Sequence, residues 1–132
     1  MRRFLLIILF IIPICSFSQG EDKTEIQWLN LNKAEKLAEK YDSEMLIFFF
    51  RNGCPDCNKM KEQTLQNPEI IKLINENFFP VILNGRTKDT IIYNGKQYTN
   101  QQPIKDGSTF RHDLYHKLVI GGGYQYYYPY IV

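Results

Sequence analysis

Six consecutive apolar residues, MLIFFF at positions 45–50, lead through a short polar loop into Cys54-Pro55-Asp56-Cys57. A short run so rich in aromatic residues is typical of a strand buried on both faces, in a sheet with helices on either side. Pro55 suits the first turn of a helix, where a missing N–H costs nothing. The sequence therefore places a cysteine pair between a buried strand and a helix N-terminus.

The surrounding patterns predict an α/β fold. Asn30 is a helix cap, and the apolar face of the helix that follows to residue 41 comprises Leu31, Ala34, Leu37, Ala38 and Tyr41. We expect the helix that starts at Pro55 to reach about Gln66, a second helix to restart at Asn67-Pro68, and a strand to follow at 79–83. Strand, helix and strand in this order predict a parallel pair joined by a crossover.

The segment from 84 to 123 is less regular. Asn94-Gly95, between possible strands at 90–93 and 96–99, is a strong hairpin signal because both turn positions need a positive φ. Ser108 is a predicted cap for a helix over 109–120, which Gly121 to Gly123 would end.

The first 18 residues have the pattern of an export signal. Arg2 and Arg3 precede an apolar run from 4 to 14, and Ser16 and Ser18 are small residues suited to a cleavage site. The run is short for a membrane span of roughly 20 residues, so we favour a cleaved signal over an anchor. We therefore expect a signal peptide at 1–18 and an exported, periplasmic domain at 19–132.

Cleavage after Ser18 changes the charge and the cysteine count. Removing Arg2 and Arg3 from 16 basic residues leaves 14, which balance the 14 acidic ones. A net charge near zero gives no reason to expect nucleic acid or an anionic membrane as a partner. Cys15 is removed as well, so Cys54 and Cys57 remain, in a compartment where disulfides form and persist.

The position of the cysteine pair favours redox chemistry. Cys54 lies just ahead of a helix whose free N–H groups and dipole favour negative charge, so we expect a lowered pKa for its thiol. Cys57 lies one turn further on the same face, within reach of a mixed disulfide formed at Cys54. Cys54 is the expected nucleophile and Cys57 the expected resolving thiol.

The motif and its flanks carry a family resemblance. Strand, C-x-x-C and helix, then Met60, TLQNPEII at 64–71 and LINENFFPV at 73–81, resemble exported bacterial thioredoxin-like proteins, a group similar to thiol-disulfide interchange domains. The resemblance implies a thioredoxin-like fold: a central mixed β-sheet flanked by helices, with an inserted hairpin and helix before a cis-proline strand. It also implies that Pro129 is the cis-proline facing the cysteines.

The implied activity is that of a thiol-disulfide oxidoreductase with the dithiol as its redox centre and no metal or other cofactor. Tyr128 and Pro129 would hold the substrate chain, with Gly53, Pro55 and Asp56 beside them. The negative charge of Asp56 disfavours the Cys54 thiolate, while Arg51 and Lys59 oppose it, and on balance we favour a reductant or interchange protein. Its partners would be disulfide-containing proteins and a membrane-embedded electron donor.

The chain departs from the family at several positions. Gly53 stands where thioredoxins have tryptophan, and Phe48 stands where they have a buried aspartate, which leaves Glu44 or Asp56 as candidates for proton transfer. The chain also stops three residues after Pro129, so we expect the final strand and helix of the fold to be missing.

Three other interpretations remain open. Cys54, Cys57, His112 and His116 are a possible zinc or copper set. The cysteines could instead form a purely structural disulfide, although so short a loop would stabilise little. The third is a non-catalytic interaction module that binds a partner through the hairpin and the tyrosine-rich end.

Overall fold

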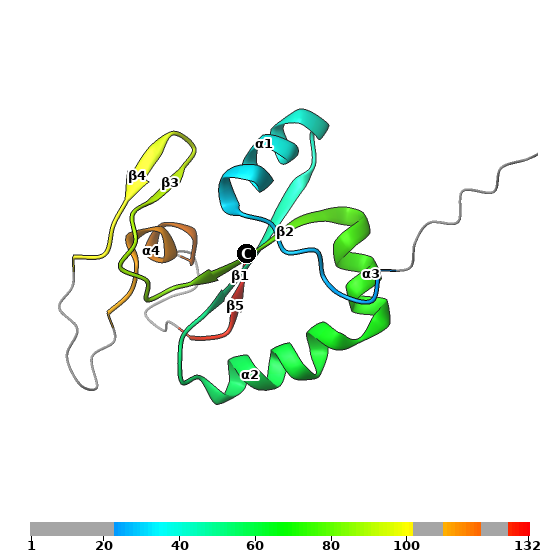
Figure 1. Ribbon diagram of the computed structural model, residues 1–132. Helices are drawn as coiled ribbons and strands as arrows, with labels where there is room; N and C mark the ends of the chain where they lie inside the picture. Colours follow the sequence, from blue (N-terminus) through cyan, green and yellow to red (C-terminus); the bar gives the residue numbers. More distant parts are fainter. Residues whose placement is uncertain (1–22, 102–109, 120–126) are drawn as a thin grey trace, which may run out of the picture.

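The computed structural model describes residues 23–101, 110–119 and 127–132. A three-stranded sheet in the order β2-β1-β5 lies at its centre (Figure 1). Strand β1 (Glu44–Phe50) pairs in parallel with β2 (Phe78–Asn84) and antiparallel with β5 (Tyr130–Ile131). The sheet is therefore mixed, and the predicted parallel pair is confirmed.

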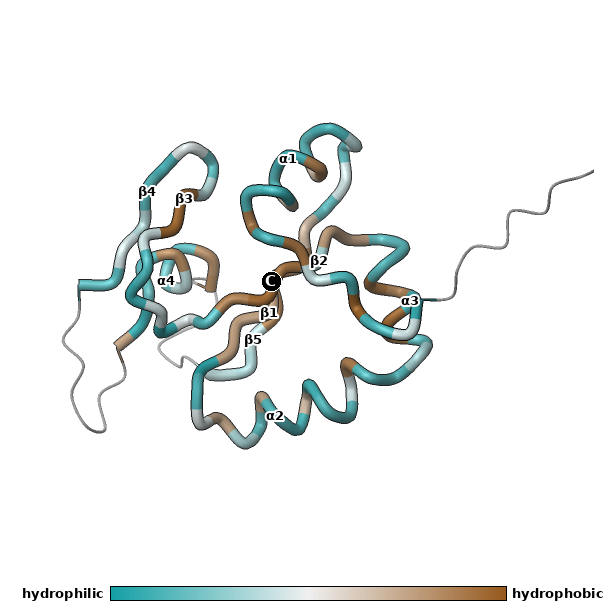
Figure 2. Tube along the Cα trace, viewed as in Figure 1, coloured by the Kyte–Doolittle hydropathy of each residue, from teal (hydrophilic) through white to brown (hydrophobic). Residues whose placement is uncertain are grey.

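The apolar run at 45–50 forms most of β1 and supplies both faces of the core. Ile47 and Phe49 belong to a buried cluster with residues of α1 (Leu31–Tyr41) and α4 (Asp113–Val119). Phe48 belongs to a second cluster, with Leu65 and residues of α3 (Pro68–Asn77). Figure 2 shows the hydrophobic colour concentrated on these central strands. The strand is thus buried on both faces, as its composition predicts.

The cap of α1 is confirmed, and one residue of its predicted apolar face is wrong. Asn30 Oδ1 accepts a hydrogen bond from the backbone N–H of Asn32, at 2.9 Å. Leu31 and Ala34 are buried, but Tyr41 is 59% exposed at the end of the helix. Its ring lies 6.2 Å from that of Phe79, so it covers the edge of the core instead of entering it.

The helix after the cysteines is shorter than predicted. Helix α2 spans Pro55–Glu62, and a separate 3₁₀ turn, η1 (Thr64–Gln66), follows it. The tighter turn buries Leu65 in the second cluster and brings Asn67 to the start of α3. There Asn67 Oδ1 accepts from the N–H groups of Glu69 and Ile70, which explains the predicted helix restart.

The predicted hairpin forms with slightly shorter strands, β3 (Ile91–Tyr93) and β4 (Lys96–Tyr98). Asn94 and Gly95 have φ values of 48° and 67°, the left-handed conformation that this turn requires. The hairpin forms a second sheet beside the central one.

Helix α4 begins at Asp113, so the prediction of a helix from residue 109 is wrong for Phe110 to His112. The backbone N–H of His112 donates to Gly85 O at 2.8 Å, and that of Asp113 donates to Thr99 O at 2.9 Å. These contacts join the start of α4 to the ends of β2 and β4. Ser108 and the three glycines at 121–123 lie outside the described residues.

The predicted signal segment, residues 1–18, also lies outside the described residues. Among the helices within them, none combines the length and the apolar character that a bilayer span requires.

Candidate active site

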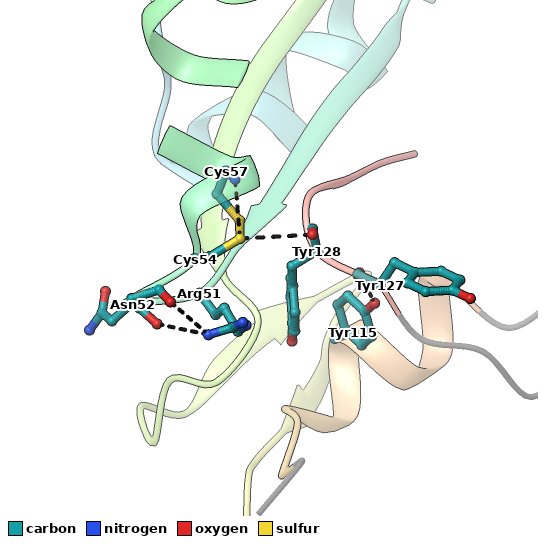
Figure 3. Close-up of a disulfide and its surroundings, with 8 residues drawn as sticks. Arg51, Asn52, Cys54, Cys57, Tyr115, Tyr127 and Tyr128 are labelled. Carbon is teal, nitrogen blue, oxygen red and sulfur yellow. Dashed lines mark hydrogen bonds between the residues drawn. A yellow bond between two sulfur atoms is a disulfide. The ribbon is translucent and has the colours of Figure 1, made fainter. Parts of the chain in front are cut away.

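Cys54 and Cys57 form a disulfide at the start of α2 (Figure 3). Their Cα atoms are 5.2 Å apart, and their side chains are 2% and 0% exposed. The pair lies directly after the loop that ends β1, so the central strand fixes its position. The bond joins the two cysteines that the sequence identifies as a dithiol centre.

The sulfur of Cys54 caps the helix. Cys54 has the extended backbone of an N-cap residue, and its Sγ accepts a hydrogen bond from the N–H of Cys57 at 3.1 Å. Once the disulfide is reduced, this N–H and the helix dipole would stabilise negative charge on Cys54 Sγ. The N-terminus of α2 therefore favours Cys54 as the thiolate of the pair.

The loop before the cysteines is held by Arg51. Its Nη1 donates to the carbonyl oxygens of Gly53 at 3.0 Å and of Asn52 at 3.4 Å. Gly53 has a φ of +63°, and no atom lies within 4 Å of the position that a Cβ would occupy. The glycine thus gives the backbone its left-handed turn and leaves the space beside Cys54 open.

The Tyr128–Pro129 segment faces the disulfide, as the family resemblance implies. The Tyr128–Pro129 peptide bond is cis, and Tyr128 O lies 3.8 Å from Cys54 Sγ (Figure 3). In the disulfide the sulfur carries no proton, so this is a close contact. In the reduced protein a Cys54 thiol can donate a hydrogen bond to the same oxygen.

The Tyr128 side chain is surrounded on several sides. Its ring centroid lies 4.8 Å from that of Tyr115 in α4, and its buried hydroxyl has no hydrogen-bond partner. Burial and the neighbouring Tyr115 raise the pKa of Tyr128, while Arg111, Arg86 and Arg51 act in the opposite direction. The hydroxyl is therefore neutral and lies among three cationic side chains.

The other predicted substrate-binding residues also lie at the disulfide. Pro55 and Asp56 form the exposed first turn of α2, and Gly53 is exposed in the preceding loop. Their contact with a substrate stays a prediction.

Glu44 is not a candidate for proton transfer at the cysteines. It begins β1, whereas Cys54 follows the other end of this strand, roughly 20 Å away by the rise of seven residues. Asp56 stays close to the pair because it follows Cys54 by two residues. Phe48 is fully buried, and its ring packs 6.2 Å from that of Trp28, so the position that holds aspartate in thioredoxins is apolar in this chain.

The structure does not bring the proposed metal ligands together. In residues 23–101, 110–119 and 127–132, no three His, Cys, Asp or Glu side chains are arranged to hold a metal ion. His112 is 1% exposed; its Nδ1 accepts from the N–H of Leu114 at 3.1 Å, so Nε2 carries the proton and donates to Asp89 O at 3.0 Å. Both ring nitrogens of His112 therefore serve to position α4.

Several residues around Tyr128 were not singled out by the sequence analysis. Gly85 and Arg86 follow β2, Arg111 precedes α4, and Tyr115 lies within α4. A glycine directly after a buried strand was the one local signal. Tertiary contacts alone show that these residues meet around the Tyr128 side chain.

A comparison with known protein families finds a match. The sequence pattern of the thioredoxin-like domain matches residues 31–118, which are 88 of the 132 residues and include both cysteines. No curated protein matches the chain. The match ends before Tyr128 and Pro129, whose place at the disulfide comes from the structure. On the extent of this match, the chain belongs to the thioredoxin-like domain family.

Proposed function

We propose that the protein is a thiol-disulfide oxidoreductase that acts on protein disulfides through Cys54 and Cys57. The observation that carries the proposal is the disulfide at the N-terminus of α2, where the Cys57 N–H donates to Cys54 Sγ at 3.1 Å. A structural bond has no need of a donor that stabilises the thiolate, whereas a bond that opens in each reaction cycle does.

In the proposed reaction, the reduced protein begins the cycle. The Cys54 thiolate attacks one sulfur of a substrate disulfide, and the other substrate sulfur leaves as a thiolate that takes up a proton. Cys57 then loses its proton and attacks Cys54 Sγ in the mixed disulfide. The substrate leaves as a dithiol, and its two electrons come from the Cys54 and Cys57 thiols, which end as the disulfide.

The substrate chain is proposed to lie along Tyr128 and Pro129. The Tyr128 carbonyl is next to Cys54 Sγ, and the exposed Gly53 leaves the adjacent space open. A substrate cysteine between these two segments would approach Cys54, which is 2% exposed, before Cys57, which is fully buried.

The proposed direction is reduction or interchange. Asp56, in the first turn of α2, disfavours the Cys54 thiolate and so favours electron transfer away from the protein. The positive charges of Arg51 and Lys59 have the opposite effect on the thiolate. The signal pattern at 1–18 supports an exported, periplasmic protein, which would need a membrane-embedded donor to reduce it again.

A glutathione redox titration of the purified protein, with trapped thiols counted by mass, tests this function. A reversible two-electron couple near or below roughly −200 mV supports a reductant or interchange protein, and one near −120 mV would make it an oxidant. With a disulfide substrate, Cys57→Ser should accumulate the mixed disulfide and the matched Cys54→Ser should not. Absence of any reversible couple would refute the proposed function.

A further inference from the structure

Three arginines lie around the Tyr128 side chain, and we call Arg51, Arg86 and Arg111 the arginine cluster. Two backbone hydrogen bonds hold the three segments together. Gly85 N–H donates to Phe50 O at 2.8 Å, and His112 N–H donates to Gly85 O at 2.8 Å. Arg51 follows Phe50, Arg86 follows Gly85, and Arg111 precedes His112. The backbone bonds between these neighbours therefore hold the three arginines close together.

The members of the arginine cluster approach the aromatic rings from different elements. The guanidinium carbon of Arg111 lies 5.9 Å from the ring centroids of both Tyr115 and Tyr128. Figure 3 shows the Arg51 side chain extending from the loop before Cys54 toward Tyr128. The guanidinium carbon of Arg86 lies 5.4 Å from the Phe110 ring.

The positive charge of Arg51 and Arg86 is not neutralised by a carboxylate in the described parts of the chain. Arg51 donates to two backbone carbonyls, and Arg86 Nε is buried without a hydrogen-bond partner. Burial lowers the pKa of Arg86, and the charges of Arg51 and Arg111 lower it further. Mutual repulsion between these partly buried cations is unfavourable, and an anion bound among them would relieve it.

Tyr128 connects the arginine cluster to the chemistry. Its carbonyl oxygen lies 3.8 Å from Cys54 Sγ, while its buried hydroxyl, which also lacks a partner, lies among the guanidinium groups. A group bound at the arginine cluster would therefore be separated from the attacking sulfur, Cys54 Sγ, by about one tyrosine side chain.

We propose that the arginine cluster binds a substrate carboxylate that lies close in space to the disulfide attacked by Cys54. A guanidinium matches a carboxylate with two parallel N–H···O bonds. The inference names a substrate class and rests on the proposed function. The carboxylate can belong to an acidic residue of a protein or to a small disulfide such as oxidised glutathione.

The first test uses reduced wild-type protein and three peptide disulfides that differ at one residue next to a cysteine, which is Glu, Gln or Lys. We expect the second-order rate of reduction to fall from Glu to Gln to Lys, with roughly a tenfold ratio between Glu and Lys at low salt. The ratio should shrink as ionic strength rises. The inference would be overturned if the three peptides were reduced at equal rates and oxidised glutathione were reduced no faster than neutral hydroxyethyl disulfide.

The second test removes the charge. Arg86→Gln should reduce the Glu to Lys rate ratio to near one, while Lys40→Gln, at the end of α1 before β1, should leave it unchanged. Arg51→Gln serves as an independent variant, and each variant is first checked for a native thermal transition. If both arginine variants fold and still reduce the Glu peptide faster than the Lys peptide by the wild-type ratio, the arginine cluster is not the source of the selectivity and the proposed site is refuted.

Hydroxyethyl disulfide separates the two claims. If the protein reduces it but shows no preference among the charged substrates, the carboxylate site fails and the oxidoreductase function stands. If the protein does not reduce it and shows no reversible couple with glutathione, the proposed function itself fails. Preference for oxidised glutathione without preference among the peptides would assign the carboxylate to a small molecule.

Discussion

The Tyr128 ring lies directly on the backbone of Gly85. A Cβ on Gly85 would come within 2.6 Å of Tyr128 Cε1 and 2.8 Å of Cζ, which no side chain tolerates without displacement. The same tyrosine contacts Cys54 Sγ through its carbonyl oxygen. The glycine after β2 therefore sets where Tyr128 lies and, through it, the surroundings of the disulfide.

Gly85→Ala is expected to displace the Tyr128 ring, because the added methyl group overlaps it. We expect a loss of about 1 to 3 kcal/mol in the free energy of unfolding and a slower reduction of peptide disulfides. Urea unfolding and stopped-flow kinetics measure the two effects. Gly95→Ala is the matched control: its φ of +67° costs about 1 kcal/mol, but its Cβ meets nothing within 4 Å, so the reaction rate should not change. Equal rates in both variants would show that Gly85 does not position Tyr128.

Phe48→Asp restores the residue that thioredoxins have at this position, and we expect it to destabilise the fold. Phe48 is 0% exposed and packs with Trp28 and Leu65 in a cluster of hydrophobic side chains. Loss of the ring and burial of a carboxyl group should cost roughly 4 kcal/mol or more, against about 1 kcal/mol for Phe48→Leu. Urea unfolding compares the two. An aspartate variant as stable as the leucine variant would show that the carboxyl group finds a polar environment at position 48.

The sequence predicted the elements whose local signals agree with their tertiary roles. The apolar run at 45–50, the Asn30 and Asn67 caps and the Asn94-Gly95 turn are all found in the structure. At 110–112 the helical pattern failed because tertiary contacts use the backbone: His112 N–H bonds Gly85 O instead of helical partners. Periodicity has no means of showing such a contact.

The part of the candidate site that lies close together in the sequence was predictable from local signals, and the rest was not. Cys54, Pro55 and Cys57 lie within four residues, so their spacing predicted a cysteine pair at a helix start, with a metal site and a redox or structural disulfide all left open. The pairing of Cys54 with Tyr128 depended on the family resemblance, since 74 positions separate them. The arginine cluster combines the loop before Cys54 with the ends of two other segments, and no spacing in the sequence predicts that meeting.

The charge of Asp56 should affect the reduction potential. Its carboxylate, in the first turn of α2, opposes the Cys54 thiolate and so destabilises the reduced protein. We expect Asp56→Asn to make the potential less negative by about 10 mV and Lys59→Gln to make it more negative by a similar amount. Glutathione equilibration of the two variants measures both shifts. Shifts of the same sign would show that changes in helix stability, not charge at the sulfur, control the potential.

His116 should make the stability of the fold depend on pH. Burial lowers its pKa from 6.5, the Arg111 charge lowers it further, and Asp113 acts in the opposite direction. Because the folded state binds the proton more weakly than the unfolded state, the contribution is fully present above about pH 6.5. It is lost as the pH falls from there through the lower pKa of the folded state. Urea unfolding at pH 7.5 and 5.5 should therefore show a larger loss of stability for the wild-type protein than for His116→Gln, in which the other titrating groups are retained. An equal loss in both proteins would mean that His116 is protonated as readily in the folded chain as in the unfolded one.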